Sequence, residues 1–90
     1  MPKLFKFGNY YVYFWSNEQN EPVHVHVSKG RAAMNATKIW LTKSGGIVIE
    51  HNKSRIPQDD LKQISDAILV NYFRICSEWK ERFGILDFYC

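Results

Sequence analysis

The chain has 90 residues, of which 46% are hydrophobic, 16% aromatic and 23% charged, and its formal net charge is +3. This length suits one small globular domain, residues 1–90, and the apolar content is too high for an intrinsically disordered chain. No apolar run approaches the roughly 20 residues that span a bilayer, and residues 1–7 lack the long apolar region of a signal peptide. We therefore expect no membrane association.

The first half of the chain is predicted to form about four to five strands of an antiparallel sheet, all within residues 3–51. Runs of aromatic and β-branched side chains, which suit a pleated surface, alternate with turn signals that contain glycine. The expected strands are Leu4–Phe7, Tyr10–Trp15, Val23–Val27, Ala33–Leu41 and Ile47–Ile49. In the third strand, the alternation Val-His-Val-His-Val places the valines on one face and His24 and His26 on the other.

From Pro57 the hydrophobic period changes to 3.6 residues, which predicts one long helix over about residues 57–83. Asn71 lies inside this stretch, but the apolar stripe continues past it without a phase slip. Gly84 is a suitable residue to end the helix and leaves a short tail, residues 84–90. The sequence thus predicts an α+β fold in which the antiparallel sheet is followed by one long C-terminal helix packed across it.

Aromatic side chains are concentrated near the N-terminus. Seven of the 14 aromatic residues fall between Phe5 and Trp15, which is more than one face of a strand can bury. Because the single helix covers only one face of the sheet, the other face would meet a partner protein, a nucleic acid or a second copy of the chain. Lys38 and Trp40 are predicted on the outward face of their strand, where an exposed tryptophan would stack on a base or anchor a protein interface. If the two faces are reversed, Trp40 lies under the helix instead.

Charge is divided unevenly along the sequence. Residues 1–55 carry eight Lys and Arg and three Asp and Glu, a difference of +5, whereas residues 56–90 carry four and six, a difference of −2. A basic sheet half is suited to phosphate backbones. The alternative is that these lysines are ordinary charges that keep edge strands soluble.

His24 and His26 are the strongest candidates for a metal-binding or acid–base role. Two imidazoles on one face of a strand would supply two metal ligands, or an acid or base that titrates near neutrality. Glu18 and Glu21 precede this strand, and a carboxylate commonly orients a histidine in both kinds of site. No third ligand stands at a diagnostic spacing, so no metal is predicted. Solvated or packed histidines are the remaining alternative.

Several motifs in these segments resemble the signature of a small bacterial family known as domain of unknown function 4160. The motifs are Phe14-Trp15-Ser16-Asn17-Glu18, Glu21-Pro22-Val23-His24-Val25-His26-Val27, Lys29-Gly30, Lys38-Ile39-Trp40-Leu41, Asn52 and Glu78-Trp79 through Phe83-Gly84. Val23 departs from a second proline usual in that family, and Lys80 from a histidine often found there.

The resemblance implies a position for the site rather than an activity. A functional surface of the family would include Asn17, Glu18, His24, His26, Lys38 and Trp40 here. Members resemble parts of two-gene modules, similar to toxin–antitoxin or DNA-binding regulatory pairs. The resemblance therefore favours a partner protein or a nucleic acid as the binding target.

We accordingly expect a non-enzymatic interaction module that binds a partner protein or nucleic acid, or a second copy of itself, through its aromatic and histidine face. One alternative is a metal-independent ribonuclease-type toxin, with His24 or His26 as acid or base, Glu18 or Glu21 as its counterpart, and Lys38 or Arg31 holding phosphate. Another is a metal-binding protein that uses His24 and His26.

The positions of the two cysteines and the absence of known catalytic motifs exclude several kinds of site. Cys76 lies within the helical pattern and Cys90 is the last residue, an arrangement unsuited to a disulfide or to a zinc finger. Without an export signal, the expected compartment is the reducing cytoplasm. No nucleotide-binding loop or hydrolytic triad is present in the sequence, and we expect no cofactor.

Overall fold

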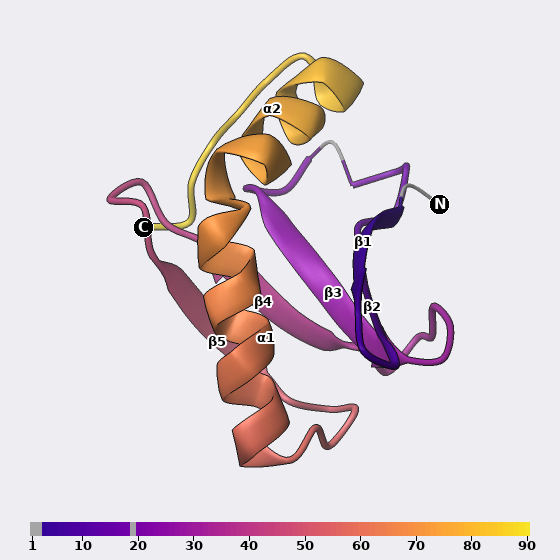
Figure 1. Ribbon diagram of the computed structural model, residues 1–90. Coiled ribbons are helices and arrows are strands. Elements are labelled where there is room, and N and C mark those ends of the chain that lie inside the picture. Colours follow the sequence, from indigo (N-terminus) through magenta and orange to yellow (C-terminus); the bar gives the residue numbers. More distant parts are fainter. Residues whose placement is uncertain (1–2, 19) are drawn as a thin grey trace.

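The computed structural model describes residues 3–18 and 20–90 of the chain. Within those residues the fold is one antiparallel sheet of five strands, in the order β1-β2-β3-β4-β5, followed by two helices (Figure 1). The elements are β1 Lys3–Phe7, β2 Tyr10–Tyr13, β3 His24–Lys29, β4 Thr37–Leu41, β5 Ile47–His51, α1 Gln58–Val70 and α2 Tyr72–Phe83. The predicted α+β class and antiparallel sheet are thus confirmed. Gln19 of the predicted loop and the first two residues lie outside the described residues.

The helical region differs from the prediction, because it consists of two helices rather than one. The break is at Asn71, whose φ of −98° and ψ of 13° depart from helical values. Its side-chain amide donates a hydrogen bond of 2.8 Å to the carbonyl oxygen of Ala67, so the side chain binds the preceding turn. The hydrophobic pattern could not reveal this break, because the apolar residues keep the same 3.6-residue spacing on both sides of Asn71. No helix of the described residues is both long and apolar enough to cross a membrane.

Two strands are shorter than the sequence pattern suggested. β2 ends at Tyr13, because the backbone N–H of Trp15 donates to the Glu18 side chain rather than to a neighbouring strand. β4 begins only at Thr37, since the preceding residues form a turn in which the Ala36 N–H donates to the Ala33 carbonyl. The residues after Tyr13 and before Thr37 therefore form loops that fold over the sheet.

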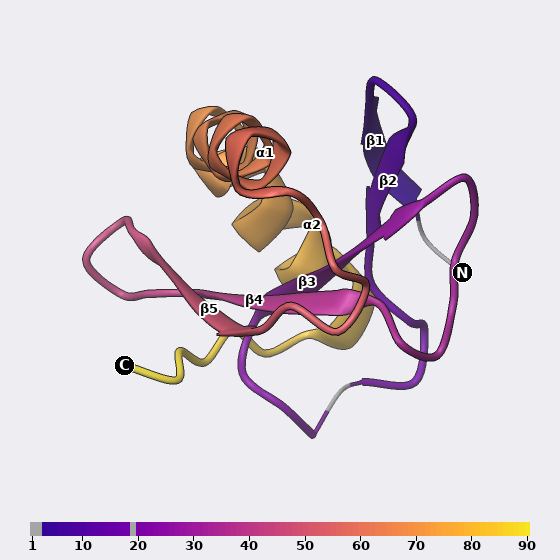
Figure 2. The same ribbon diagram turned by 90° about the horizontal axis from the view of Figure 1, so that it is seen from below.

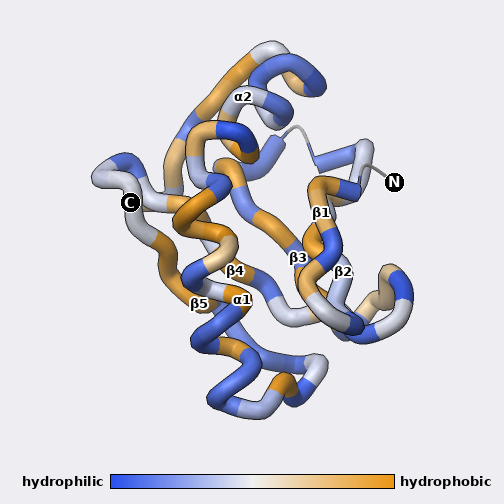
Figure 3. The backbone as a smooth tube through the Cα atoms, viewed as in Figure 1, coloured by the Kyte–Doolittle hydropathy of each residue, from blue (hydrophilic) through white to orange (hydrophobic). Residues whose placement is uncertain are grey.

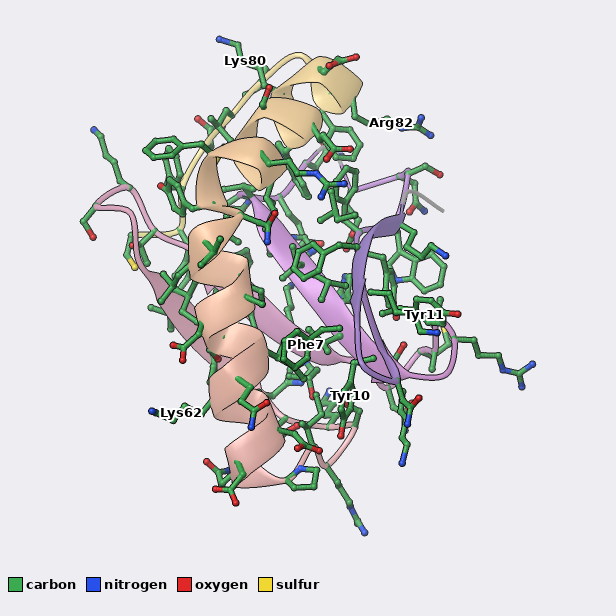
Figure 4. The ribbon with its side chains drawn as sticks, in the orientation of Figure 1. Phe7, Tyr10, Tyr11, Lys62, Lys80 and Arg82 are labelled. Atoms are coloured by element: carbon green, nitrogen blue, oxygen red, sulfur yellow. The ribbon has the colours of Figure 1, made fainter. Side chains whose placement is uncertain are left out.

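The main core lies between α1 and one face of the sheet, which we call the inner face. The sheet contributes Val12, Val25, Val27, Ile39 and Leu41, and the helices contribute Leu61, Ile64, Ile68, Tyr72, Ile75 and Trp79. Polar and apolar residues alternate along α1 (Figure 3), as expected for a helix with one buried side. The β1–β2 hairpin rises beside α1, with Phe7 and Tyr10 on the side that faces the helix (Figure 4). The Tyr10 hydroxyl donates to Asp60 at 2.8 Å.

The opposite, outer face of the sheet is covered in part by the chain itself. The loop between β2 and β3 lies on the side of the sheet away from α1 (Figure 2). The segment after α2 runs back along the sheet, where the ring of Tyr89 stacks on Trp40 with centroids 4.8 Å apart. Trp40 is consequently only 7% exposed. The expectation of an exposed tryptophan was therefore wrong, because the C-terminal tail, which the sequence did not place, covers this ring.

Candidate functional site

The outer face of β3 presents the two histidines side by side. Val25 and Val27 are fully buried on the inner face, while His24 and His26 project from the other side, as their alternation predicted. Their ring centroids are 4.9 Å apart and the ring planes are nearly perpendicular, at 89°. The pair is therefore close enough to share one partner.

Glu18 is that shared partner. Its Oε2 lies 2.7 Å from Nε2 of His24 and 2.9 Å from Nε2 of His26. Its Oε1 accepts a hydrogen bond of 2.7 Å from the backbone N–H of Trp15. The loop after β2 thus turns back so that one carboxylate reaches both rings. We call Glu18, His24 and His26 the histidine cluster.

The hydrogen-bond partners of His24 determine which ring atoms carry hydrogens. Nδ1 lies 2.9 Å from the carbonyl oxygen of Pro22, and because a carbonyl only accepts, Nδ1 must be an N–H donor. Nε2 faces the ionised carboxylate of Glu18, which also only accepts. Both ring nitrogens of His24 are thus engaged by protein acceptors, although its side chain is 0% exposed.

The Glu18 carboxylate is the acidic partner of both histidine rings. Burial, the largest influence, raises the pKa of this carboxyl, but it is outweighed by the hydrogen bonds from His24 and His26, the charge of His24 and the Trp15 N–H. Together these lower the pKa of Glu18 to about 2. Glu18 is therefore ionised at neutral pH, and its carboxylate is held between the two histidine rings.

Aromatic rings surround the cluster. The His24 ring lies 5.3 Å from Trp40 and 5.2 Å from Trp79, measured between centroids. On the other side, the His26 ring lies 5.6 Å from Tyr13. Such apolar walls lower the local dielectric and strengthen the polar contacts that they enclose. Tyr13 and Trp40, two of the aromatic residues that the sequence assigned to a partner interface, therefore shield this polar cluster.

The other residues predicted for the site are placed unequally. Lys38 pairs with His26 across the β3–β4 ladder, and its Nζ lies 2.7 Å from Glu21 and 4.3 Å from the Trp40 ring centroid. Trp40 pairs with His24 in the same ladder, so both expected residues of β4 adjoin the cluster. Asn17 is exposed in the turn before Glu18, and its side chain makes no hydrogen bond to any other residue that the structure describes.

Three contributors to the site were missed by reasoning from the sequence. Trp79 was assigned to the helical core stripe, yet its ring contacts His24. The Pro22 carbonyl is a backbone atom that no residue pattern reveals. Tyr89 was left in an unassigned tail. The closely spaced apolar residues Ile85, Leu86, Phe88 and Tyr89 were the available signal that this tail packs.

A second feature of the outer face is a row of side chains that crosses the whole sheet. The successive strand pairs are Lys3 with Tyr13, Tyr13 with His26, His26 with Lys38, and Lys38 with His51. Paired residues project from the same face, so four basic side chains share this row. We call Lys3, His26, Lys38 and His51 the basic row.

The charges of the basic row contribute to the pKa of its last member, His51. The pKa of His51 is lowered from its ordinary value, first by burial and next by the positive charge of Lys53, with smaller contributions from Lys38 and His26. Glu50 acts in the opposite direction without reversing the shift. Burial is thus the main cause of the shift, and the positive charges of Lys53, Lys38 and His26 add to it.

Beside the row, Tyr11 lies between two lysines. Nζ of Lys3 is 4.7 Å and Nζ of Lys6 is 5.6 Å from the centroid of the Tyr11 ring. Lys6 and Tyr11 are cross-strand partners in the β1–β2 ladder. Tyr11 projects away from α1 (Figure 4), so this group belongs to the outer face. Within residues 3–18 and 20–90, no carboxylate forms an ion pair with either lysine.

Comparison with known proteins gives one match. A family model described as a domain of unknown function (DUF4160) matches residues 9–80. The matched segment runs from the β1–β2 turn into α2, so it contains the whole histidine cluster and both expected residues of β4. No curated protein and no solved structure matches the chain significantly.

Proposed function

The chain belongs to the DUF4160 family, whose description assigns no function, and we propose that it acts as a non-enzymatic binding module for nucleic acid. The proposed contact surface is the outer face of the sheet, with the basic row and the Lys3–Lys6–Tyr11 group as its parts. The observation that carries the proposal is the convergence of basic side chains from four of the five strands on that one face.

Charge and geometry support a polyanion as the partner. The sheet half of the sequence has a difference of +5 between basic and acidic residues, against −2 in the helix half. Phosphate groups attract lysines irrespective of base sequence, and they release counterions when bound. Basic side chains aligned across a sheet can contact several successive phosphates of a nucleic-acid backbone, which a single cationic side chain cannot.

Tyr11 adds a feature that favours nucleic acid over a merely acidic surface. An aromatic ring flanked by lysines offers a stacking platform for a base and charges for the adjoining phosphates. Lys3 and Lys6 contact the ring and have no carboxylate partner among the described residues. Single-stranded RNA or DNA, whose bases are free to stack, is the form that this arrangement suits.

The histidine cluster does not favour the ribonuclease alternative. A general acid or base must come within hydrogen-bond reach of the substrate. The His24 side chain is 0% exposed, and both of its ring nitrogens are already engaged, with Pro22 and Glu18. The arrangement supports a role in holding the outer face together, and the proposal therefore excludes catalysis by His24.

The test is binding of a fluorescent 20-nucleotide single-stranded RNA, measured by anisotropy over a range of salt concentrations. We expect the double variant Lys3→Glu/Lys6→Glu to bind more weakly. If each lysine neutralises one phosphate, the slope of log K against log salt becomes smaller by about 1.4. The matched control is Lys62→Glu/Lys80→Glu, which changes the net charge equally but on the helices (Figure 4).

Three results would contradict the proposal. One is the absence of RNA or DNA binding at low salt. Another is equal weakening by both double variants, which would indicate a response to net charge alone. The third is retention of an acidic partner protein, encoded by a neighbouring gene, on the same surface without any nucleic acid, which would favour a toxin–antitoxin-like protein pair.

A further inference from the structure

The geometry points to the histidine cluster as a binding site for a divalent transition-metal ion of the zinc class, with Nε2 of His24, Nε2 of His26 and Oε2 of Glu18 as ligands. One such atom from each residue lies within 4.8 Å of the others. Imidazole nitrogens and a carboxylate oxygen are preferred ligands of Zn²⁺, and three protein ligands leave a fourth position for water or another group. This inference is independent of nucleic-acid binding.

The contacts around the cluster already orient its ligand atoms. The Pro22 carbonyl accepts from Nδ1–H of His24, which directs Nε2 toward the centre. The Trp15 N–H binds Oε1 of Glu18 and leaves Oε2 as the inward atom. Outer contacts of this kind, from a backbone carbonyl to a histidine and from a donor to a carboxylate, are typical of metal centres.

The arrangement of charges also favours a cation at the centre. Without a metal, Nδ1 of His24 faces the Pro22 carbonyl and Nε2 faces the Glu18 carboxylate, both of which only accept hydrogen bonds. When the metal binds, the Nε2 proton of His24 leaves to solvent and the metal takes its place beside Oε2 of Glu18. The hydrogen that Nε2 of His26 directs at the same oxygen likewise leaves to solvent, and the neutral His26 ring takes one up at Nδ1 in exchange. His24 keeps its Nδ1–H bond to Pro22.

The distances require only a small movement. At metal–ligand bonds of about 2.0–2.1 Å, tetrahedral ligand atoms lie about 3.3 Å apart. The present separations from Oε2 of Glu18 to the two Nε2 atoms are 2.7 and 2.9 Å. His24 and His26 are held by the β3 ladders on both sides, whereas Glu18 belongs to a loop. Zinc binding therefore needs a shift of the Glu18 side chain by about half an ångström, and it also needs the two Nε2 atoms, which lie within 4.8 Å of each other, to reach the tetrahedral spacing of about 3.3 Å.

The remaining surroundings suit an enclosed but accessible ion. The Glu18 and His26 side chains are 10% and 13% exposed, so the cluster reaches solvent on their side. Away from this opening, His24 is flanked by Trp40 and Trp79. A dry wall on one side and a narrow opening on the other strengthen binding and leave an entry path.

Calorimetric titration of untagged protein with ZnCl₂ tests the inference. Every variant is made in a Cys90→Ser background, because Cys90 carries an exposed thiol that would itself bind zinc. We expect one equivalent of zinc to bind, and His26→Ala and Glu18→Gln each to weaken binding about 100-fold or more. The matched control is His51→Ala, which removes the one histidine outside the cluster and should leave the affinity within about threefold.

A spectroscopic measurement keeps the test independent of the stability of the variants. Co²⁺ added to the Cys90→Ser protein should give the intense visible absorption of a four-coordinate site, and stoichiometric zinc should displace it. Circular dichroism identifies any variant that has failed to fold. The inference is overturned if the Cys90→Ser protein binds no zinc, if folded His26→Ala binds as tightly as the parent, or if His51→Ala alone abolishes binding.

Discussion

Oε2 of Glu18 lies 2.7 Å from Nε2 of His24, and this contact ties the loop between β2 and β3 to the first residue of β3. The same oxygen lies 2.9 Å from His26. One loop carboxylate therefore serves two strand residues whose side chains the sheet has placed on one face. Four predictions that follow from this contact, and from the elements packed around it, concern stability and are independent of partner and metal.

Replacing Glu18 by glutamine should lower the free energy of unfolding by about 3 kcal/mol, because it removes the ionised partner of two largely buried imidazoles. Urea denaturation at pH 7 measures the effect. The control is Glu21→Gln on the same loop, whose ion pair with Lys38 is more exposed and contributes less than about 1 kcal/mol. Equal losses in the two variants would show that the cluster is no more than a surface ion pair.

The same carboxylate should make stability fall in acid. The pKa of Glu18 is about 2 in the folded protein, against an ordinary value of 4.5. Because the folded pKa is the lower one, the stabilisation is fully present above about pH 5 and is lost as the pH falls toward 2. Its size is at most about 3 kcal/mol. Unfolding free energies at pH 7, 5, 4 and 3 should converge between the parent and Glu18→Gln, and parallel curves would contradict the assignment.

Asn71→Ala should destabilise the protein by about 1 kcal/mol, although alanine is the better helix former by about 0.6 kcal/mol. The variant loses the side-chain bond to Ala67 and favours a continuous helix. A straight helix would carry Trp79 away from His24, which its ring now contacts. Asp66→Ala, at an exposed position of α1, is the control and should cost nothing. Urea denaturation that shows Asn71→Ala to be stabilising would mean that the bend has no structural role.

Tyr89→Ala should cost about 1 kcal/mol and expose Trp40, because the two rings are stacked at 4.8 Å with an interplanar angle of 10°. The emission of Trp40 should shift to longer wavelength and become more accessible to acrylamide. Ile85→Ala in the same tail is the control, since that side chain is already 61% exposed. Unchanged emission in Tyr89→Ala would show that the tail does not cover Trp40 in solution.

The local parts of this architecture were predictable from residue patterns. Alternating valines and histidines placed His24 and His26 on one face, because successive strand residues point to opposite sides. The 3.6-residue period located the helical region, and Gly84, with a φ of 79°, ends α2 as expected. The strand that contains Lys38 and Trp40 was also predicted, although its pairing with the histidine strand was not.

The sequence by itself determined which side chains share a strand face and where the helical period begins, because both depend on backbone geometry over a few residues. Only the tertiary structure decided that Glu18 folds back onto His24, that Tyr89 covers Trp40, and that the chain bends at Asn71. These contacts depend on how separate segments pack, and the same local pattern is compatible with several packings. Of the aromatic residues that first suggested an open interface, Tyr13 and Trp40 flank the histidine cluster, while the basic row and Tyr11 provide the surface proposed for the partner.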